Sequence, residues 1–92
     1  MIDLVLRIEA EADLRAIIEY YQEVAPHVVV HIQHDIERAF ALLQRHPLIG
    51  PPIADRPFRR IVTSRYKFKI AYLPEPDRIV VLGLFRFQDR EA

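Results

Sequence analysis

Two helix-period stripes of apolar residues, joined without a linker, constrain the fold of this chain most strongly. Apolar side chains recur every three or four positions over residues 9–24 and again from Pro26 to about His46, as on one face of an amphipathic helix. The stripes consist of Leu14, Ile17, Ile18, Tyr21 and Val24, and of Val29, Ile32, Ile36, Ala39, Phe40 and Leu43. Pro26 suits the first turn of the second helix. So short a connection predicts an antiparallel helical hairpin.

Residues with the period of a β-strand flank this hairpin. Residues 2–8, IDLVLRI, alternate between apolar and other side chains and predict a short first strand. Residues 46–57, HPLIGPPIADRP, contain four prolines and should interrupt regular structure. From Phe58 the period becomes two, and over residues 65–72 aromatic or aliphatic side chains alternate mostly with cationic ones. Residues 78–87, RIVVLGLFRF, are apolar on both faces for most of their length, which is typical of a central strand.

The predicted order is therefore strand, helix, helix and three strands, which is an α+β fold. We expect the helical hairpin to pack on one face of an antiparallel sheet whose last three strands form a meander. A length of 92 residues allows one domain, residues 1–92, with one hydrophobic core. The charged N-terminal segment does not resemble a signal peptide, and no apolar run is long enough to cross a bilayer. We expect a cytoplasmic protein that makes no membrane contact.

The charges of this neutral chain are unevenly distributed. Residues 1–50 contain four basic and eight acidic side chains, whereas residues 51–92 contain nine basic and five acidic ones. Six of the basic side chains lie between Arg56 and Lys69, and the run FRRIVTSRYKFKIAYL, residues 58–73, contains no acid. The C-terminal half should therefore form a basic surface that could meet phosphate groups or an acidic protein.

We expect several of these cations to lie beside one another on the sheet face that the helices leave open. The expected members are Arg59 or Arg60, Lys67, Lys69 and Arg86. Like charges on adjacent strands destabilise a sheet. One interpretation is that acids such as Asp55 or Asp89 neutralise the cations, which then only keep the face soluble. The other is that the face is a docking surface for phosphates or for an acidic partner.

Other chemistry finds little support in the sequence. His27, His31 and His34 should share one face of the second helix, with a spacing that two zinc ligands can use. Because no cysteine or glutamate evidently joins them and Arg38 continues the stripe, we predict no metal site. The absence of cysteine also excludes disulfides and cysteine–zinc sites. Two glycines cannot build a phosphate-binding loop, so no cofactor is expected.

Four segments, taken in order, resemble the ParE/RelE superfamily of bacterial toxins. They are ADLRAIIEYYQEVAP, LLQRHPLIG, FRRIVTSRYKFKIAYL and IVVLGLFRFQDRE, at residues 12–26, 42–50, 58–73 and 79–91. The resemblance covers nearly the whole chain. It implies the fold predicted above and a type II toxin–antitoxin system, in which a cognate antitoxin wraps and silences the toxin.

RelE-like members of this superfamily cut mRNA on the ribosome, using cations of the sheet together with a tyrosine or histidine near the C-terminus. By resemblance, the candidates for such a site here are Arg60, Lys69 and Arg86. Arg86 stands where many members carry histidine, and no tyrosine or histidine follows Tyr72. The chain therefore lacks an evident group that could move a proton near neutral pH.

ParE-like members poison DNA gyrase instead, and the chain resembles this subgroup more closely. Such poisoning is a binding activity, so we expect a target-binding surface rather than catalytic residues. The expected target-binding residues are Arg59, Arg60, Arg65, Lys67, Lys69 and Arg86. The tail FQDREA, residues 87–92, is expected to contribute. The alternatives are a RelE-like mRNA endonuclease acting at the ribosome and a non-toxic homologue that only binds antitoxin.

The resemblance also implies partners for the chain. A cognate antitoxin should cover part of the sheet and the hairpin by adding a strand or a helix to exposed apolar surface. The target would be DNA gyrase or, in the alternative, the ribosome with its mRNA. The chain could form a homodimer, or a heterotetramer with the antitoxin.

Overall fold

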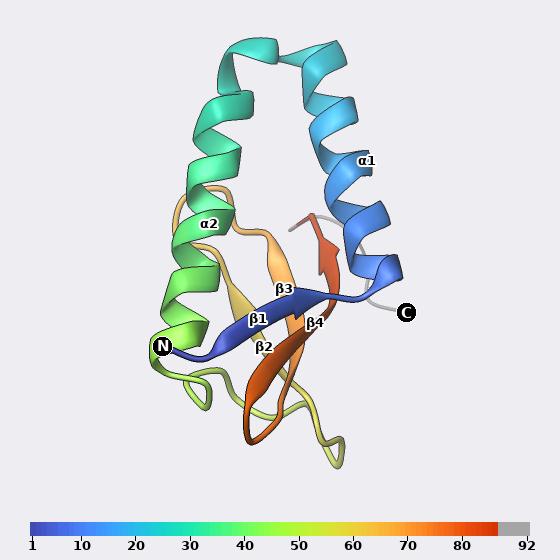
Figure 1. Cartoon of the computed structure of the whole chain (residues 1–92). Helices are drawn as coiled ribbons and strands as arrows, with labels where there is room; N and C mark the ends of the chain where they lie inside the picture. Colours follow the sequence, from blue (N-terminus) through green and yellow to red (C-terminus); the bar gives the residue numbers. More distant parts are fainter. Residues whose placement is uncertain (87–92) are drawn as a thin grey trace.

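A helical hairpin covers one face of a four-stranded sheet in the computed structural model, which describes residues 1–86 (Figure 1). The elements are β1 (Asp3–Leu6), α1 (Ile8–Val24), a short 3-10 helix η1 (Pro26–Val28), α2 (Val29–Arg45), β2 (Arg59–Val62), β3 (Lys69–Pro74) and β4 (Arg78–Phe85). This order confirms the predicted α+β fold. The segment between α2 and β2 contains no helix or strand, as its four prolines predicted.

The strands are arranged in the order β1-β4-β3-β2. β2, β3 and β4 form the predicted antiparallel meander. β1 differs from the predicted antiparallel arrangement because it pairs with β4 in parallel, with Leu4 opposite Ile79. β4 therefore has a neighbour on each side, as its apolar character on both faces indicated. The two edges of the sheet are β1 and β2.

The core lies between the sheet and the hairpin. Ile70 and Tyr72 of β3 and Ile79 and Val81 of β4 are fully buried. The helices contribute Ala10, Ile17, Ile32, Ile36, Ala39 and Leu43 to the same cluster. Each large aliphatic side chain buried here stabilises the fold by roughly 1.5–3 kcal/mol relative to its exposed state. Most of the predicted helical stripes thus face the sheet.

The junction of the two helices follows from Pro26. The amide of Ala25 donates to the carbonyl oxygen of Tyr21 at 2.9 Å and closes α1. Pro26 begins η1, and the amide of Val28 then donates to the Ala25 carbonyl at 3.0 Å. Val24, which the stripe placed toward the core, is 57% exposed, because the tip of the hairpin extends beyond the strands (Figure 1).

The connection between β2 and β3 departs from the alternating pattern. β3 begins only at Lys69, so Arg65 and Lys67 lie in the connecting turn and not on a strand. Lys67 has a φ of 62°, in the left-handed region that interrupts a strand. The turn is closed by the amide of Thr63, which donates to the Phe68 carbonyl at 2.8 Å, and by the amide of Phe68, which donates to Oγ1 of Thr63 at 2.9 Å.

Candidate functional site

The cations expected on one sheet face are distributed over several parts of the molecule. Arg59 pairs with Tyr72, which faces the helices, whereas Arg60 pairs with Ala71 on the opposite, open face. Nη1 of Arg59 donates to the carbonyl oxygen of Gly50 at 2.7 Å and to that of Leu48 at 3.2 Å. Arg59 therefore anchors the loop that follows α2, and of the two expected alternatives Arg60 is the one on the open face.

Arg86 and Arg65 also lie away from the open face. The guanidinium of Arg86 is 4.6 Å from the centroid of the Tyr20 ring on α1, and that of Arg65 is 5.2 Å from the centroid of the Tyr66 ring in the turn. Lys69 shares the open face with Arg60, since it lies two residues from Ala71 on the same strand. The prediction of one continuous cationic face is therefore wrong. Residues 87–92 lie outside the described part of the chain.

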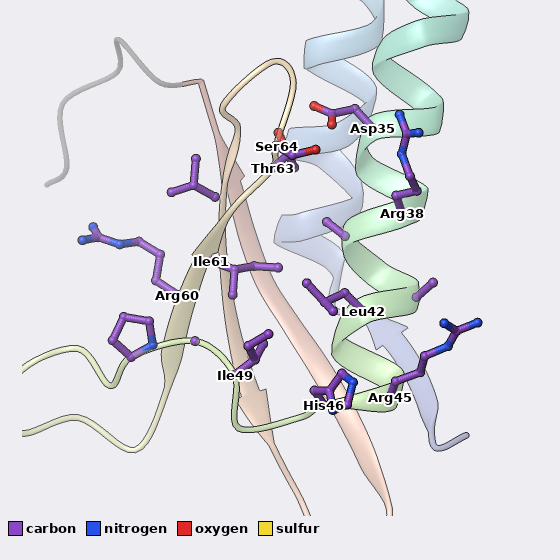
Figure 2. A pocket seen from close by; sticks show the side chains of 15 residues that line it. Asp35, Arg38, Leu42, Arg45, His46, Ile49, Arg60, Ile61, Thr63 and Ser64 are labelled. Atoms are coloured by element: carbon purple, nitrogen blue, oxygen red, sulfur yellow. The ribbon is translucent and has the colours of Figure 1, made fainter.

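A groove of about 780 Å³ lies between α2 and β2; we call it the α2–β2 groove (Figure 2). Its apolar walls are Leu42 of α2, Ile49 of the following loop and Ile61 of β2, and Val62 borders it. Leu42, Ile49 and Val62 are 39%, 50% and 46% exposed, respectively. Leu42 and Ile49 thus lie open to solvent along a single groove, which is typical of a surface that binds another protein. Val62 pairs with Lys69, so its side chain points to the open face and only its backbone borders the groove.

The backbone of β2 adds hydrogen-bonding capacity to this groove. β2 is an edge strand, and its first half is covered because the amide of Arg60 donates to the Pro51 carbonyl at 3.2 Å. Val62, two residues on, must direct its own N–H and C=O to the same outer side. Within residues 1–86 no further strand covers this part of the edge. An unpaired edge next to apolar side chains can accept a strand from a partner.

The rim of the α2–β2 groove is predominantly basic. Arg38 and Arg45 extend from α2 beside the groove (Figure 2). The one acid among the described residues that line it, Asp35, is almost completely buried. Its carboxylate accepts hydrogen bonds from the backbone amides of Arg65 at 3.1 Å and Tyr66 at 2.7 Å. An incoming segment would therefore meet guanidinium groups before it met a carboxylate, which favours an acidic partner.

These contacts control the ionisation of Asp35. Burial alone would raise the pKa of this carboxyl group. The hydrogen bonds from the Tyr66 amide, the Thr63 side chain and the Arg65 amide, together with the charge of Arg38, outweigh burial and hold the pKa below its ordinary value. Asp35 is thus charged at neutral pH and holds the β2–β3 turn against α2.

The loop that carries Ile49 is held in place by its contacts with the sheet. The amide of Gly50 donates to the hydroxyl oxygen of Tyr72 at 3.0 Å. A Cβ atom at Gly50 would lie 2.6 Å from the carbonyl oxygen of Arg60, so only glycine fits this close approach. Burial is the main reason that the pKa of Tyr72 is raised, although the Gly50 hydrogen bond and the charge of Arg59 oppose it. Leu48 and Ile49 are thereby presented to solvent on a fixed loop, a surface that no local pattern in the sequence indicated.

The histidine stripe offers no closed ligand set in the structure. His27, His31 and His34 are exposed on the hairpin. No group of three histidine, cysteine, aspartate or glutamate side chains in residues 1–86 is placed to hold a metal ion. Over the same residues, no helix has the length and apolar character needed to cross a membrane.

The family model of the ParE toxin of the type II toxin–antitoxin system parDE matches residues 4–89. The chain belongs to the ParE family. A search of curated proteins found no match. The family assignment confirms the resemblance seen in the sequence and makes this ParE-family chain a toxin component of a type II toxin–antitoxin system.

Two solved structures share the fold of this ParE-family chain. A chain of the chromosomal ParDE toxin–antitoxin system from P. aeruginosa matches with a TM-score of 0.82 and 24% sequence identity, over 96% of this chain and 98% of that one. A chain of the RelBE2 toxin–antitoxin complex from Mycobacterium tuberculosis matches with a TM-score of 0.65 and 19% identity, over 96% and 93% of the two chains. At these identities the matches establish the fold.

Proposed function

We propose that this ParE-family chain inhibits DNA gyrase by binding to it in the cytoplasm, and that a cognate antitoxin neutralises it. We choose a binding activity over RNA cleavage because of the side chains on the open face. Arg60 and Lys69 supply positive charge there, but all four histidines lie between His27 and His46, in the helical layer or directly after it. An RNA-cleaving site needs groups that take up and release a proton in addition to cations.

The tyrosines of the sheet layer do not supply such a group. Tyr72 is fully buried toward the helices, and its hydroxyl group is engaged by the Gly50 amide. Tyr66 packs against Phe68 at a centroid distance of 6.5 Å, on the margin of the core. The chemistry of the described residues thus supports a surface that binds a target over one that cleaves RNA.

The α2–β2 groove is the proposed site of the antitoxin. Its exposed aliphatic walls would receive alternate apolar side chains of an extended segment, and the outer edge of β2 at Val62 would pair with that segment's backbone. Arg38 and Arg45 on the rim favour acidic residues between the apolar ones.

A RelE-like ribonuclease remains the second candidate, because Arg60 and Lys69 do share one face and could stabilise a phosphate in a cleavage reaction. It would need an acid or base supplied by the ribosome. In that case Arg86, which lies against Tyr20, would be the least suited of the three catalytic candidates. The third candidate is a non-toxic homologue that only binds antitoxin.

The deciding experiment follows DNA and protein synthesis in parallel after the chain is induced alone in bacteria. We expect DNA synthesis to fail first and purified gyrase to lose supercoiling activity. Lys69→Glu, on the open face, should relieve that inhibition. Arg15→Glu makes an equal charge change at an exposed position of α1 and should not relieve it. Earlier failure of protein synthesis would support the ribonuclease instead. Unimpaired growth would leave the non-toxic homologue as the better account.

A further inference from the structure

The outer side of β1 is the second uncovered edge of the sheet. β1 pairs with β4 on one side, and within residues 1–86 no strand lies on its other side. Figure 1 shows β1 in front of the remaining strands. Nε2 of Gln44 on α2 donates to the carbonyl oxygen of Ile2 at 2.8 Å, so the edge that remains runs from Asp3 to Arg7. Such an edge can accept a strand from another molecule.

Leu4 and Leu6 carry the unpaired backbone groups of this edge. The amide of Arg7 donates to the carbonyl oxygen of Val81 at 3.1 Å, toward β4. Arg7 is extended, with a φ of −71° and a ψ of 168°, so the alternation of backbone direction along β1 continues to this residue. Leu4 and Leu6 therefore direct their N–H and C=O groups away from β4, to the outer side.

The side chains of the same segment alternate between the two faces of the sheet. Leu4 and Leu6 are partly buried against the core. Asp3, Val5 and Arg7 share the open face and are exposed, Val5 by 39%. Along DLVLR, residues 3–7, the open face thus presents an acid, an aliphatic side chain and a base in that order.

We propose that the β1 edge binds the β1 edge of a second copy of this chain in antiparallel orientation, with Val5 opposite Val5 of the copy. This register makes Leu4 and Leu6 of the copy a pair that exchanges both N–H···O=C bonds, and likewise Leu6 and Leu4 of the copy. Asp3 then faces Arg7 of the copy at each end. Slipping the pairing by two residues, which keeps the faces unchanged, would separate these charges. The segment is thus complementary to itself about a two-fold axis, as an isologous interface requires.

The guanidinium of Arg7 is placed for this cross-strand ion pair. Its Nε donates to the carbonyl oxygen of Leu82 at 3.0 Å and lies 3.4 Å from Oε1 of the exposed Glu9. The ion pair with Glu9 is exposed and therefore weak. Because the contacts of Arg7 with the described residues use Nε, its terminal nitrogens retain donors for the carboxylate of Asp3 of the copy.

The proposed dimer joins two sheets into one continuous sheet. β1 and β2 are opposite edges, so both α2–β2 grooves stay open and antitoxin binding is compatible with the dimer. Contact between two short strands buries less than the roughly 800 Å² per partner of a standard interface, so we expect a dissociation constant on the order of 10–100 µM. This inference goes beyond gyrase inhibition and does not depend on it.

Asp3 is the better of the two charges to replace first. It is exposed, and its neighbour on β4, Arg78, is hydrogen-bonded through Nε to Glu75 at 2.7 Å. Asp3→Arg therefore breaks no side-chain hydrogen bond among the described residues and should fold. It places an arginine opposite Arg7 of the copy, so like charges meet at both ends of the pairing.

The test is sedimentation velocity of the purified chain over about 1–200 µM, a range that spans the expected dissociation constant. The wild type should shift from monomer toward dimer as its concentration rises. Asp3→Arg should raise the dissociation constant about tenfold or more. Glu19→Arg makes the same charge change at an exposed position of α1 and should alter the constant by less than about twofold.

A mixture of two variants separates the proposed pairing from a loss of fold. Arg7→Glu alone sets two acids opposite each other and, like Asp3→Arg, should stay mostly monomeric. In a mixed dimer of the two variants every acid faces an arginine, so mixing them in equal amounts should restore association to within about threefold of the wild type. Circular dichroism checks that both variants are folded. Folded variants that do not associate on mixing would contradict the register.

A wild type that sediments as a monomer over the whole range would overturn the proposal, and so would equal association of the wild type and Asp3→Arg. A monomeric wild type together with weaker binding of purified antitoxin to Asp3→Arg would assign the edge to the antitoxin instead. Because gyrase is absent from the sedimentation experiment, gyrase inhibition by a chain that stays monomeric would overturn this inference alone.

Discussion

Asp35 of α2 accepts a hydrogen bond from the backbone amide of Tyr66 across 31 residues of sequence, at a donor–acceptor distance of 2.7 Å. Its other carboxylate oxygen accepts the amide of Arg65 at 3.1 Å. This buried acid thus satisfies two adjacent amides of the β2–β3 turn and ties the turn to the helical layer. The same turn positions the end of β2 beside the α2–β2 groove, so the acid links the stability of the fold to the shape of the proposed antitoxin site.

Replacing this carboxylate should destabilise the protein. Asp35→Asn places an NH₂ group against one of the two backbone amides, which then loses its acceptor in a buried site. The free energy of unfolding should fall by about 1–3 kcal/mol in urea denaturation. Glu37→Gln removes a charge from an exposed neighbour on the same helix and should change stability by less than about 0.5 kcal/mol. Equal stability of the two variants would contradict the role given to Asp35.

The contribution of Asp35 should also depend on pH. Its pKa in the folded protein lies below the ordinary value of 3.8 that applies to the unfolded chain, so the folded state favours the charged carboxylate. The resulting stability is fully present above pH 3.8 and is lost as the pH falls through the lower folded pKa. The difference in unfolding free energy between the wild type and Asp35→Asn should therefore narrow below pH 3.8. Urea titrations near neutral pH and at acidic pH test this, and a constant difference would contradict it.

Gly50→Ala should distort the loop that carries Ile49. The added Cβ would meet the backbone carbonyl oxygen of Arg60 at 2.6 Å, and backbone atoms cannot rotate away. We expect a loss of about 1–3 kcal/mol in thermal or urea unfolding. Gly83→Ala is the matched control, because its nearest atom, at 3.0 Å, belongs to the Phe85 side chain. A larger loss at Gly83 than at Gly50 would show that the close approach is not what requires glycine.

Antitoxin binding should depend on the apolar wall of the α2–β2 groove. Leu42→Asp removes an exposed aliphatic contact and opposes an acidic partner, so the affinity for the cognate antitoxin should fall about tenfold or more in calorimetric titration, or by ~1.4 kcal/mol. Ile8→Asp makes the same change at an 80% exposed position on α1 and should leave binding unchanged. Unaltered affinity in Leu42→Asp would place the antitoxin elsewhere.

The same variant separates neutralisation from toxicity. Leu42 lies in the α2–β2 groove, whereas Lys69, the cation proposed to bind gyrase, lies on the open face of the sheet. Leu42→Asp alone should therefore still inhibit supercoiling by gyrase, while coexpressed antitoxin should rescue growth poorly. Loss of gyrase inhibition in this variant would mean that target and antitoxin share the groove.

Local patterns in the sequence were sufficient for the elements and their order. The apolar spacing of residues 9–24 and the position of Pro26 predicted the hairpin, because helix period and proline geometry are properties of neighbouring residues. The two-sided apolar character of residues 78–87 likewise predicted a central strand, which β4 is. The ordered segments also carried the family resemblance that the match over residues 4–89 confirms.

Only the tertiary structure decided which side chains share a surface. Arg59 and Arg60 are neighbours in sequence but lie on opposite faces, because strand alternation separates them and the Gly50 loop takes up Arg59. Lys67 lies in the β2–β3 turn and not on the predicted strand, because the carboxylate of Asp35, far away in sequence, holds the neighbouring turn residues. The α2–β2 groove and the pair of cations on the open face, Arg60 and Lys69, come together only through sheet register and helix packing, which depend on long-range contacts that no local pattern encodes.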